Sequence, residues 1–256
     1  MNSIQWQAFC SFKKDFKQKI DEWSCLVPNL AQLQKQAADL AKTPSYPFET
    51  PVVYNTDLDK ITPQDDIKLI VIGDNPGKDE QLAKNQRYLC GQAGKIADGF
   101  FKRNPSLGID FRKNVIILNK TPVHSAKTAQ LRTMMKNGGP RVEQLILQSQ
   151  LWMAQKTAEL LKDLCKGDQA PQLWLVGYSE LKGKGFFIPY RDRLKACLYD
   201  TAAWQNVYVF QHFSMNRFTI DLGEFVQKNK LSSAPLEEQI RLVGEFHKRE
   251  IFSACL

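Results

Sequence analysis

Four short runs of apolar, largely β-branched residues mark the chain from residue 67 onward. They are IKLIVIG at 67–73, NVIILN at 114–119, QLWLVG at 172–177 and NVYVFQ at 206–211. Continuous apolar runs of this length are typical of strands buried on both faces. Stretches with the apolar spacing of helices separate them, near 95–103, 141–165 and 190–200. This alternation predicts an α/β fold, a three-layer α/β/α sandwich around a central, mostly parallel four-stranded sheet.

Helical patterns also precede and follow this alternating region. Apolar residues recur at helical spacing from Ile4 to Trp23, and a second such run covers 30–40. The proline-rich stretch 43–55 predicts a connecting loop. Two further helical patterns follow the last strand, at 222–229 and 235–252. We expect a single domain over 1–256, with 1–45 as an N-terminal helical extension and 224–256 as C-terminal helices.

The composition is that of a globular protein. Of 256 residues, 43% are hydrophobic and 24% charged. No apolar stretch approaches the roughly 18 residues that span a bilayer, and the first residues have no apolar signal core. The six cysteines form no CxxC pair, and together with the three histidines they show no zinc or iron–sulfur spacing. We therefore expect a cytoplasmic monomer with no membrane partner, no metal and no cofactor.

Positive charge is concentrated in the middle of the chain. The formal net charge is +8, and residues 81–150 alone carry 12 basic and 3 acidic side chains. Such a segment favours a polyanionic partner, most simply nucleic acid, although a solvated basic face is the other interpretation. The side chains of this segment that could contact phosphates are Lys84, Arg87, Lys120, Lys127, Arg132, Lys136 and Arg141.

Polar segments follow the predicted strands, where open parallel sheets bind their ligands. They read DNPG at 74–77, NKTP at 119–122, YS at 178–179 and HFSMNR at 212–217. GDNPG has neither the GK[ST] of a phosphate loop nor the GxGxxG of a dinucleotide fingerprint. Taken singly, Asn75, Asn119 and His212 are as well explained by turn or strand-end geometry as by chemistry. Their placement after successive strands is what favours a common site.

Four motifs in this order resemble those of the uracil-DNA glycosylase superfamily, over roughly residues 51–225. GDNPG resembles the Asn-Pro-Gly motif of the single-strand-selective and mismatch-specific branches, and LCGQAG resembles the Gly-x-Ala-Gly segment of the iron–sulfur branch. VIILN resembles the strand that ends in the base-reading asparagine, and FQHFSMNR resembles the His-Pro-Ser motif that opens the DNA-penetrating loop. The resemblance implies a monofunctional, metal-free DNA glycosylase of base-excision repair. Its substrate would be uracil, or a related damaged base, in single- or double-stranded DNA.

The resemblance also implies roles for individual residues. Asn75 would position the attacking water, and His212 would donate a hydrogen bond to O2 of the departing base. Asn119 would read the edge of the base, because its amide can both donate and accept. Relatives stack an aromatic ring on uracil where this chain has Leu89, and Tyr88 could substitute by a shift of one residue.

DNA contacts are implied for the glycine segment and for the loop after the last strand. Extrusion of a base from a duplex needs a side chain that takes its place. The candidates for that wedge run from Met215 to Phe218. Phosphate or strand contacts are expected from Gly91, Gly94, Lys120, Ser214, Met215, Asn216 and Arg217.

The chain also departs from the pattern of that superfamily. Leu89 replaces the stacking aromatic, and Phe213 replaces the proline of His-Pro-Ser. Asp74, Asp79 or Glu80 could supply a carboxylate in place of Asn75. The alternative hypothesis is a catalytically weak or inactive nucleic-acid-binding protein of the same fold. A third is a small-molecule hydrolase or nucleotide enzyme on a similar sheet, which predicts no affinity for DNA.

Overall fold

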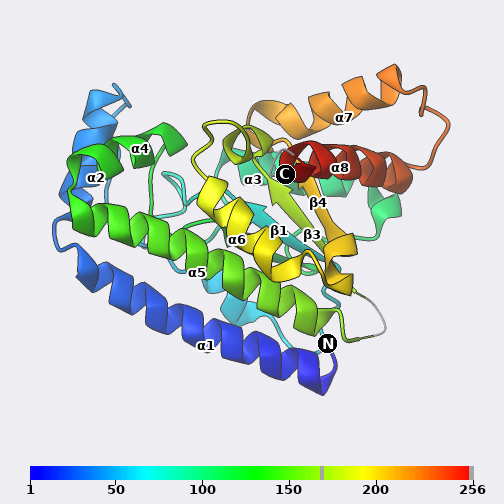
Figure 1. Ribbon diagram of the computed structural model, residues 1–256, viewed down its shortest axis with the longest axis horizontal. Coiled ribbons are helices and arrows are strands. Elements are labelled where there is room, and N and C mark those ends of the chain that lie inside the picture. The colour runs from blue at the N-terminus through cyan, green and yellow to red at the C-terminus, as the bar shows by residue number, and fades with distance from the viewer. Residues whose placement is uncertain (168–169, 254–256) are drawn as a thin grey trace.

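A computed structural model describes residues 1–167 and 170–253 and confirms the α/β sandwich (Figure 1). Its four strands all pair in parallel, in the order β2-β1-β3-β4. Each strand lies within one of the four apolar runs. The bounds are β1 Leu69–Gly73, β2 Val115–Asn119, β3 Gln172–Val176 and β4 Val207–Phe210.

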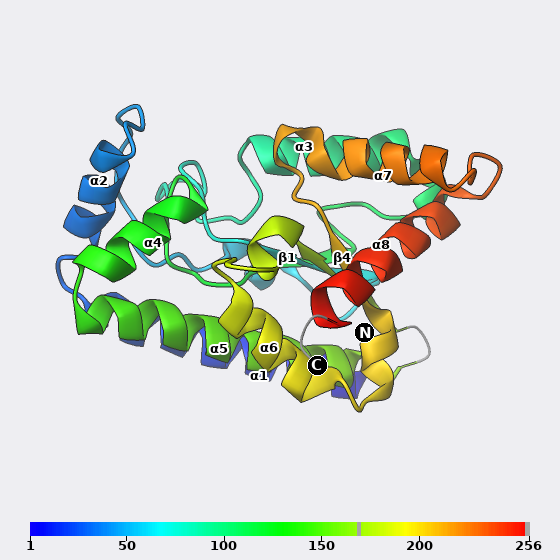
Figure 2. The same cartoon turned by 45° about the horizontal axis from the view of Figure 1, so that its top comes forward.

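Helices cover both faces of the sheet, as Figure 2 shows. On one face lie α5 (Pro140–Leu164) and α6 (Ile188–Leu198), with α1 (Ser3–Leu26) outside α5. On the other face lie α3 (Gln92–Arg103) and α7 (Arg217–Lys228), while α8 (Leu236–Ser253) packs against β4. Strand side chains alternate between the two resulting cores. In β1, Ile70 and Ile72 belong to one core, and Leu69 and Val71 belong to the other.

The remaining elements are shorter. Helix α2 (Leu30–Leu40) packs on α4 (Thr128–Asn137), a helix that the sequence analysis did not predict. The loop 43–55 returns to the sheet, where Val52 forms an isolated bridge with Val123. Within the described residues there are also five 3₁₀ turns: η1 Thr56–Lys60, η2 Pro105–Leu107, η3 Tyr178–Leu181, η4 Ala202–Asn206 and η5 Ser214–Asn216.

Aromatic rings fill the core beneath α3 and α7. Trp174 of β3 stacks on Phe218 of α7, with ring centroids 5.7 Å apart. Phe101 and Phe210 contact the same indole. Phe218 is 2% exposed. Its place among the wedge candidates was therefore wrong, because its ring belongs to the core that anchors α7.

The topology determines where a ligand can bind. The chain leaves β1 for β2 on one side of the sheet and returns to β3 on the other, so the strand order switches at β1. The register pairs Gly73 with Asn119 at the carboxyl ends of β1 and β2. Crevices of parallel sheets open at such a switch point, outside the carboxyl ends of the strands. No helix within the described residues is long and apolar enough to cross a membrane.

The packing of α1 generates a stability prediction. Phe16 is fully buried and stacks on Trp152 of α5, with ring centroids 5.8 Å apart. We expect Phe16→Ala to lower the free energy of unfolding by about 3–5 kcal/mol, because it removes a buried ring and leaves a cavity. Urea denaturation measures this change, with Lys14→Ala on the exposed face of α1 as the matched control. Equal stabilities of the two variants would show that α1 is not part of the cooperative core.

Candidate functional site

A cavity of about 490 Å³ opens at the carboxyl ends of the strands. Asn75, Asn119 and His212, which are far apart in the sequence, all line it. The segments after all four strands contribute to its wall, together with the start of α3 and residues 125–128. The structure therefore brings together the three side chains that the sequence analysis placed in one site.

Asn119, the last residue of β2, is 2% exposed. Its Oδ1 lies against Gly73, so closely that a Cβ at that position would collide with it. The buried Nδ2 has no hydrogen-bond partner among the described residues. A buried N–H group without a partner costs about 1–3 kcal/mol, so this amide is prepared for an acceptor on a ligand.

His212 follows β4 and is held by Ser214. The backbone N–H of Ser214 donates to Nδ1 at 3.1 Å, and the Ser214 hydroxyl lies 2.8 Å from the same nitrogen. Nδ1 is therefore an acceptor, which places the proton of the neutral ring on Nε2. Burial lowers the pKa of His212, the Asp74 carboxylate opposes that shift and the Lys120 ammonium adds to it. At neutral pH the ring is an uncharged donor whose Nε2 has no partner among the described residues.

The side chain of Asn75 is largely committed to its own loop. Nδ2 donates to the carbonyl oxygen of Ser125 at 2.9 Å and to the Ser125 hydroxyl at 3.0 Å. Oδ1 accepts a longer hydrogen bond, 3.3 Å, from Thr128. The second lone pair of Oδ1 is the position that this residue can offer to a water molecule.

His124 is hydrogen-bonded to the loop that carries Asn75, a structural role that the sequence analysis did not predict. Its Nδ1 lies 2.8 Å from the carbonyl oxygen of Pro76, and its Nε2 lies 3.1 Å from the hydroxyl of Tyr46. Burial lowers its pKa to about 4, so the ring is neutral, donates to Pro76 and accepts from Tyr46. The local sequence gave no signal for this contact, because Tyr46 and Pro76 lie 78 and 48 residues away.

Lys120 is not a phosphate contact, contrary to the prediction from the basic segment. Its side chain is fully buried. Nζ contacts Asp74 Oδ1 at 2.5 Å and donates to the carbonyl oxygens of Val176 at 2.5 Å and Gly73 at 3.3 Å. All three donors of the ammonium group are used within the protein, and Lys120 is not among the residues that line the cavity.

Tyr88 does not supply the missing aromatic surface. It is fully buried, and its hydroxyl donates to the carbonyl oxygen of Val53 at 2.5 Å. Leu89 lines the cavity instead, in a left-handed conformation with φ of 49°. The prediction that Tyr88 replaces the stacking ring was wrong, because its side chain turns into the core, away from the cavity. Apart from the imidazole of His212, none of the described residues that line the cavity carries an aromatic ring.

The two glycines of LCGQAG have different positions. Gly91 lines the cavity and is the N-cap of α3, without a side-chain cap for the first N–H groups of the helix. Gly94 is buried outside the cavity lining, and a Cβ there would collide with the carbonyl of Leu89. Gly94 thus allows α3 to approach the loop, whereas the expected phosphate contact is left to Gly91.

The loop after β4 presents a strained and exposed tip. Met215 and Asn216 have φ values of 53° and 56°, and Met215 is 77% exposed. A second cavity of about 390 Å³ lies on the other side of His212 and Ser214, and Met215 and Arg217 line it. A left-handed backbone conformation costs free energy at a residue such as Met215. The surrounding structure must therefore hold the loop in this conformation, which exposes the Met215 side chain.

The basic residues of the middle segment differ in availability. Arg87 forms an ion pair with Asp57, and Arg132 forms one with Glu180. Lys127 is exposed at the rim of the cavity. Exposed positions farther from it are Lys84, Lys136 and Arg141.

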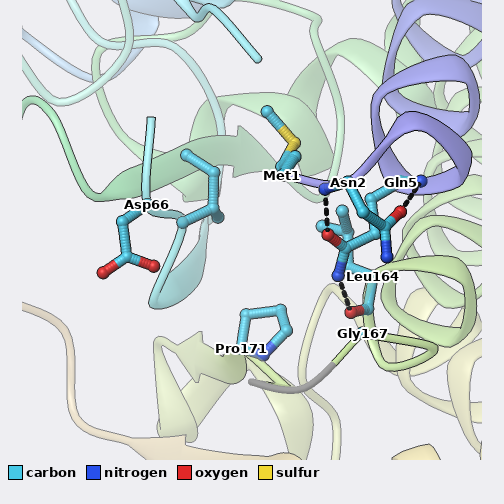
Figure 3. Close-up of a pocket in the computed structure, with 8 residues that line it drawn as sticks. Met1, Asn2, Gln5, Asp66, Leu164, Gly167 and Pro171 are labelled. Carbon is cyan, nitrogen blue, oxygen red and sulfur yellow. Dashed lines mark hydrogen bonds between the residues drawn. The ribbon is translucent and has the colours of Figure 1, made fainter. Parts of the chain in front are cut away.

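Another cavity lies at the amino ends of β1 and β3, near Met1, Gln5 and Pro171 (Figure 3). None of the predicted site residues lines it. The Gln5 amide in its wall is already hydrogen-bonded, because it accepts from the N–H of Asn2 and donates to the carbonyl oxygen of Leu164. Among the described residues no group of three His, Cys, Asp or Glu side chains could hold a metal ion.

The chain was compared with models of protein families, with curated proteins and with solved structures, and none of them matches. The geometry of the cavity is therefore the basis for a functional hypothesis.

Glu80 in the cavity wall generates a prediction on pH and stability. It accepts from the N–H of Gly77 at 3.1 Å, and burial raises its pKa to about 7. In the unfolded chain the carboxyl ionises from about pH 4.5, but in the folded protein it stays neutral until about pH 7. The wild type should therefore lose up to about 3 kcal/mol of stability relative to Glu80→Gln as the pH rises from 4.5 to 7.

Urea unfolding of wild type and Glu80→Gln at several pH values measures this difference. A difference in unfolding free energy that stays constant from pH 4.5 to 8 would contradict the assignment of the raised pKa to Glu80.

Proposed function

We propose that the protein is a monofunctional DNA glycosylase that hydrolyses the N-glycosidic bond of uracil or a related damaged base. The observation that carries this proposal is the unpartnered, buried Nδ2 of Asn119 in the same cavity as the neutral His212. These two hydrogen-bond donors on the wall of the cavity match the two carbonyl groups of uracil. The four ordered motifs of the sequence support the same function.

The reaction needs stabilisation of a departing base anion. As the C1′–N bond breaks, negative charge develops on O2 of the base, and the Nε2–H of His212 can donate to it. A neutral donor suits this task because it keeps its proton while it stabilises the charge. Asn119 can donate through Nδ2 to O4 of uracil, a position where cytosine carries an amino group and offers no acceptor.

The surroundings of the cavity suit a nucleic-acid substrate. A base inside a duplex must be extruded before it can enter such a cavity. Met215, exposed on the strained loop, is the side chain that we propose fills the space left in the duplex by the extruded base. Lys127, Arg217 and the N-terminus of α3 at Gly91 are the proposed phosphate contacts.

An excision assay tests the proposed function. Oligonucleotides with uracil, hypoxanthine, xanthine or oxidised pyrimidines, single-stranded and opposite guanine, are incubated with excess enzyme, and abasic sites are cleaved with alkali. We expect excision by the wild type and a rate lowered about 10²–10³-fold in His212→Ala, because one donor to the developing charge is lost. Asn119→Ala should also be slow.

Lys35→Ala, on the exposed surface of α2, is the control and should excise like the wild type. Failure of the wild type on every base would reject the proposal. Salt-sensitive DNA binding without excision would select an inactive binding protein of this fold instead.

Lys127 generates a separate prediction on binding. We expect Lys127→Ala to weaken the binding of damaged and undamaged oligonucleotides equally, since a phosphate contact carries no base information. The slope of log K against log salt should become shallower by about 1. Fluorescence anisotropy between 50 and 200 mM salt, again with Lys35→Ala as control, measures the slope. A selective loss for the damaged strand would show that Lys127 contacts the base instead.

A further inference from the structure

The carboxylate of Asp74 lines the cavity at the end of β1, and two neighbours fix its position. Oδ1 lies 2.5 Å from the buried Nζ of Lys120. Gly177, with φ of 95°, packs so closely on the carboxylate that a Cβ would collide with it. Oδ2 accepts no hydrogen bond from any described residue. One oxygen is thus anchored and the other is available to the cavity.

Lys120 reaches this carboxylate through the interior of the protein. Its ammonium also donates to the carbonyl oxygens of Gly73 and Val176. It thereby links the carboxyl ends of β1 and β3, next to Asp74, which follows β1. A buried ammonium is expensive unless a carboxylate compensates it. The ion pair therefore holds the Asp74 carboxylate in one position, close enough to His212 that both Asp74 and Lys120 influence the pKa of that ring.

The other acidic side chains of the cavity wall are less suitable. Glu80 is buried, burial raises its pKa to about 7, and its Oε2 already accepts a hydrogen bond from the N–H of Gly77. One oxygen of Glu180 accepts from both Arg132 and the backbone N–H of Phe186. Asp79 is exposed and packs beside Gly91. Asp74 alone among these four directly follows a strand of the sheet and is paired with a buried cation.

Asn75 cannot complete the reaction by itself. An amide oxygen can orient a water molecule but has no useful basicity, and three contacts to Ser125 and Thr128 already restrain this amide. A water molecule that attacks a sugar must lose a proton. Within the cavity, a carboxylate oxygen that can take it, and that accepts no hydrogen bond from any described residue, is Oδ2 of Asp74.

On the basis of the proposed function, we propose that Asp74 is the catalytic carboxylate of this site and that Lys120 is its positioning residue. As the C1′–N bond breaks, its electron pair leaves on the base, and Asp74 stabilises the positive charge that develops on the sugar. The water oxygen forms a bond to C1′ and passes its proton to Oδ2. The base anion, held by His212, takes a proton from solvent, and Asp74 returns its own to solvent.

Single-turnover excision by Asp74→Asn tests this inference, on a base that the wild type removes. We expect the rate to fall about 10²–10⁴-fold while the affinity for the oligonucleotide stays within about threefold, because the carboxylate acts in the chemical step. Asp163→Asn, near the end of α5, is the matched control, since it removes the carboxylate of a surface ion pair with Lys166 and should leave the rate unchanged.

Rescue separates a catalytic role from a structural one. Formate should accelerate Asp74→Ala in a concentration-dependent way, because a small carboxylate can occupy the vacated position, and it should not accelerate the wild type. Lys120→Met should be slow as well. The double variant Asp74→Asn/Lys120→Met, which leaves no unpaired charge in the core, should be no slower than Asp74→Asn alone, since both changes remove the same function.

The outcomes distinguish the two proposals. A wild type that excises, together with a folded Asp74→Asn or double variant that excises within threefold of it, would overturn the role of Asp74 and leave the proposed function intact. Absence of rescue by formate would also count against a catalytic carboxylate. A wild type that excises no base would overturn the proposed function and this inference with it.

Discussion

The buried ammonium of Lys120 is the interaction on which the geometry of the cavity depends. It is fully buried, and it bonds a carbonyl at the end of β1, a carbonyl at the end of β3 and the carboxylate of Asp74. Parallel strands bring their carboxyl ends together, but the backbone alone does not fix the loops that follow. One cation with three acceptors therefore fixes Asp74, the first residue of the segment after β1. Removal of the Asp74 carboxylate would leave the fully buried ammonium of Lys120 uncompensated, so site and fold are coupled energetically.

The layered fold could be predicted from the sequence because its strands are buried on both faces. Such strands appear as continuous apolar runs, and their alternation with helices leaves few topologies. Helix α4 escaped prediction, since it is short, follows a loop and buries only three side chains: Gln130, Leu131 and Met134. It packs on α5, the next helix along the chain, and also on α2, a segment far away in the sequence.

Site residues were predictable where position along a strand determines them, and unpredictable where a distant partner does. Asn119 and His212 follow directly from the ends of β2 and β4. The burial of Lys120 depends on Val176, which is 56 residues away, and nothing in the local sequence distinguishes this lysine from an exposed one. The inward orientation of Tyr88 likewise depends on a hydrogen bond to Val53.

The leucine at position 89 has a consequence for how any planar ligand would be held. An aromatic side chain against a base contributes about 1–3 kcal/mol per base, and it does so almost regardless of the identity of the ring. Without such a surface, a ring in this cavity is held mainly by its edge, through directional polar contacts. Affinity would then be modest, a released ring would depart quickly, and discrimination would follow the pattern of carbonyl groups more than the size of the ring.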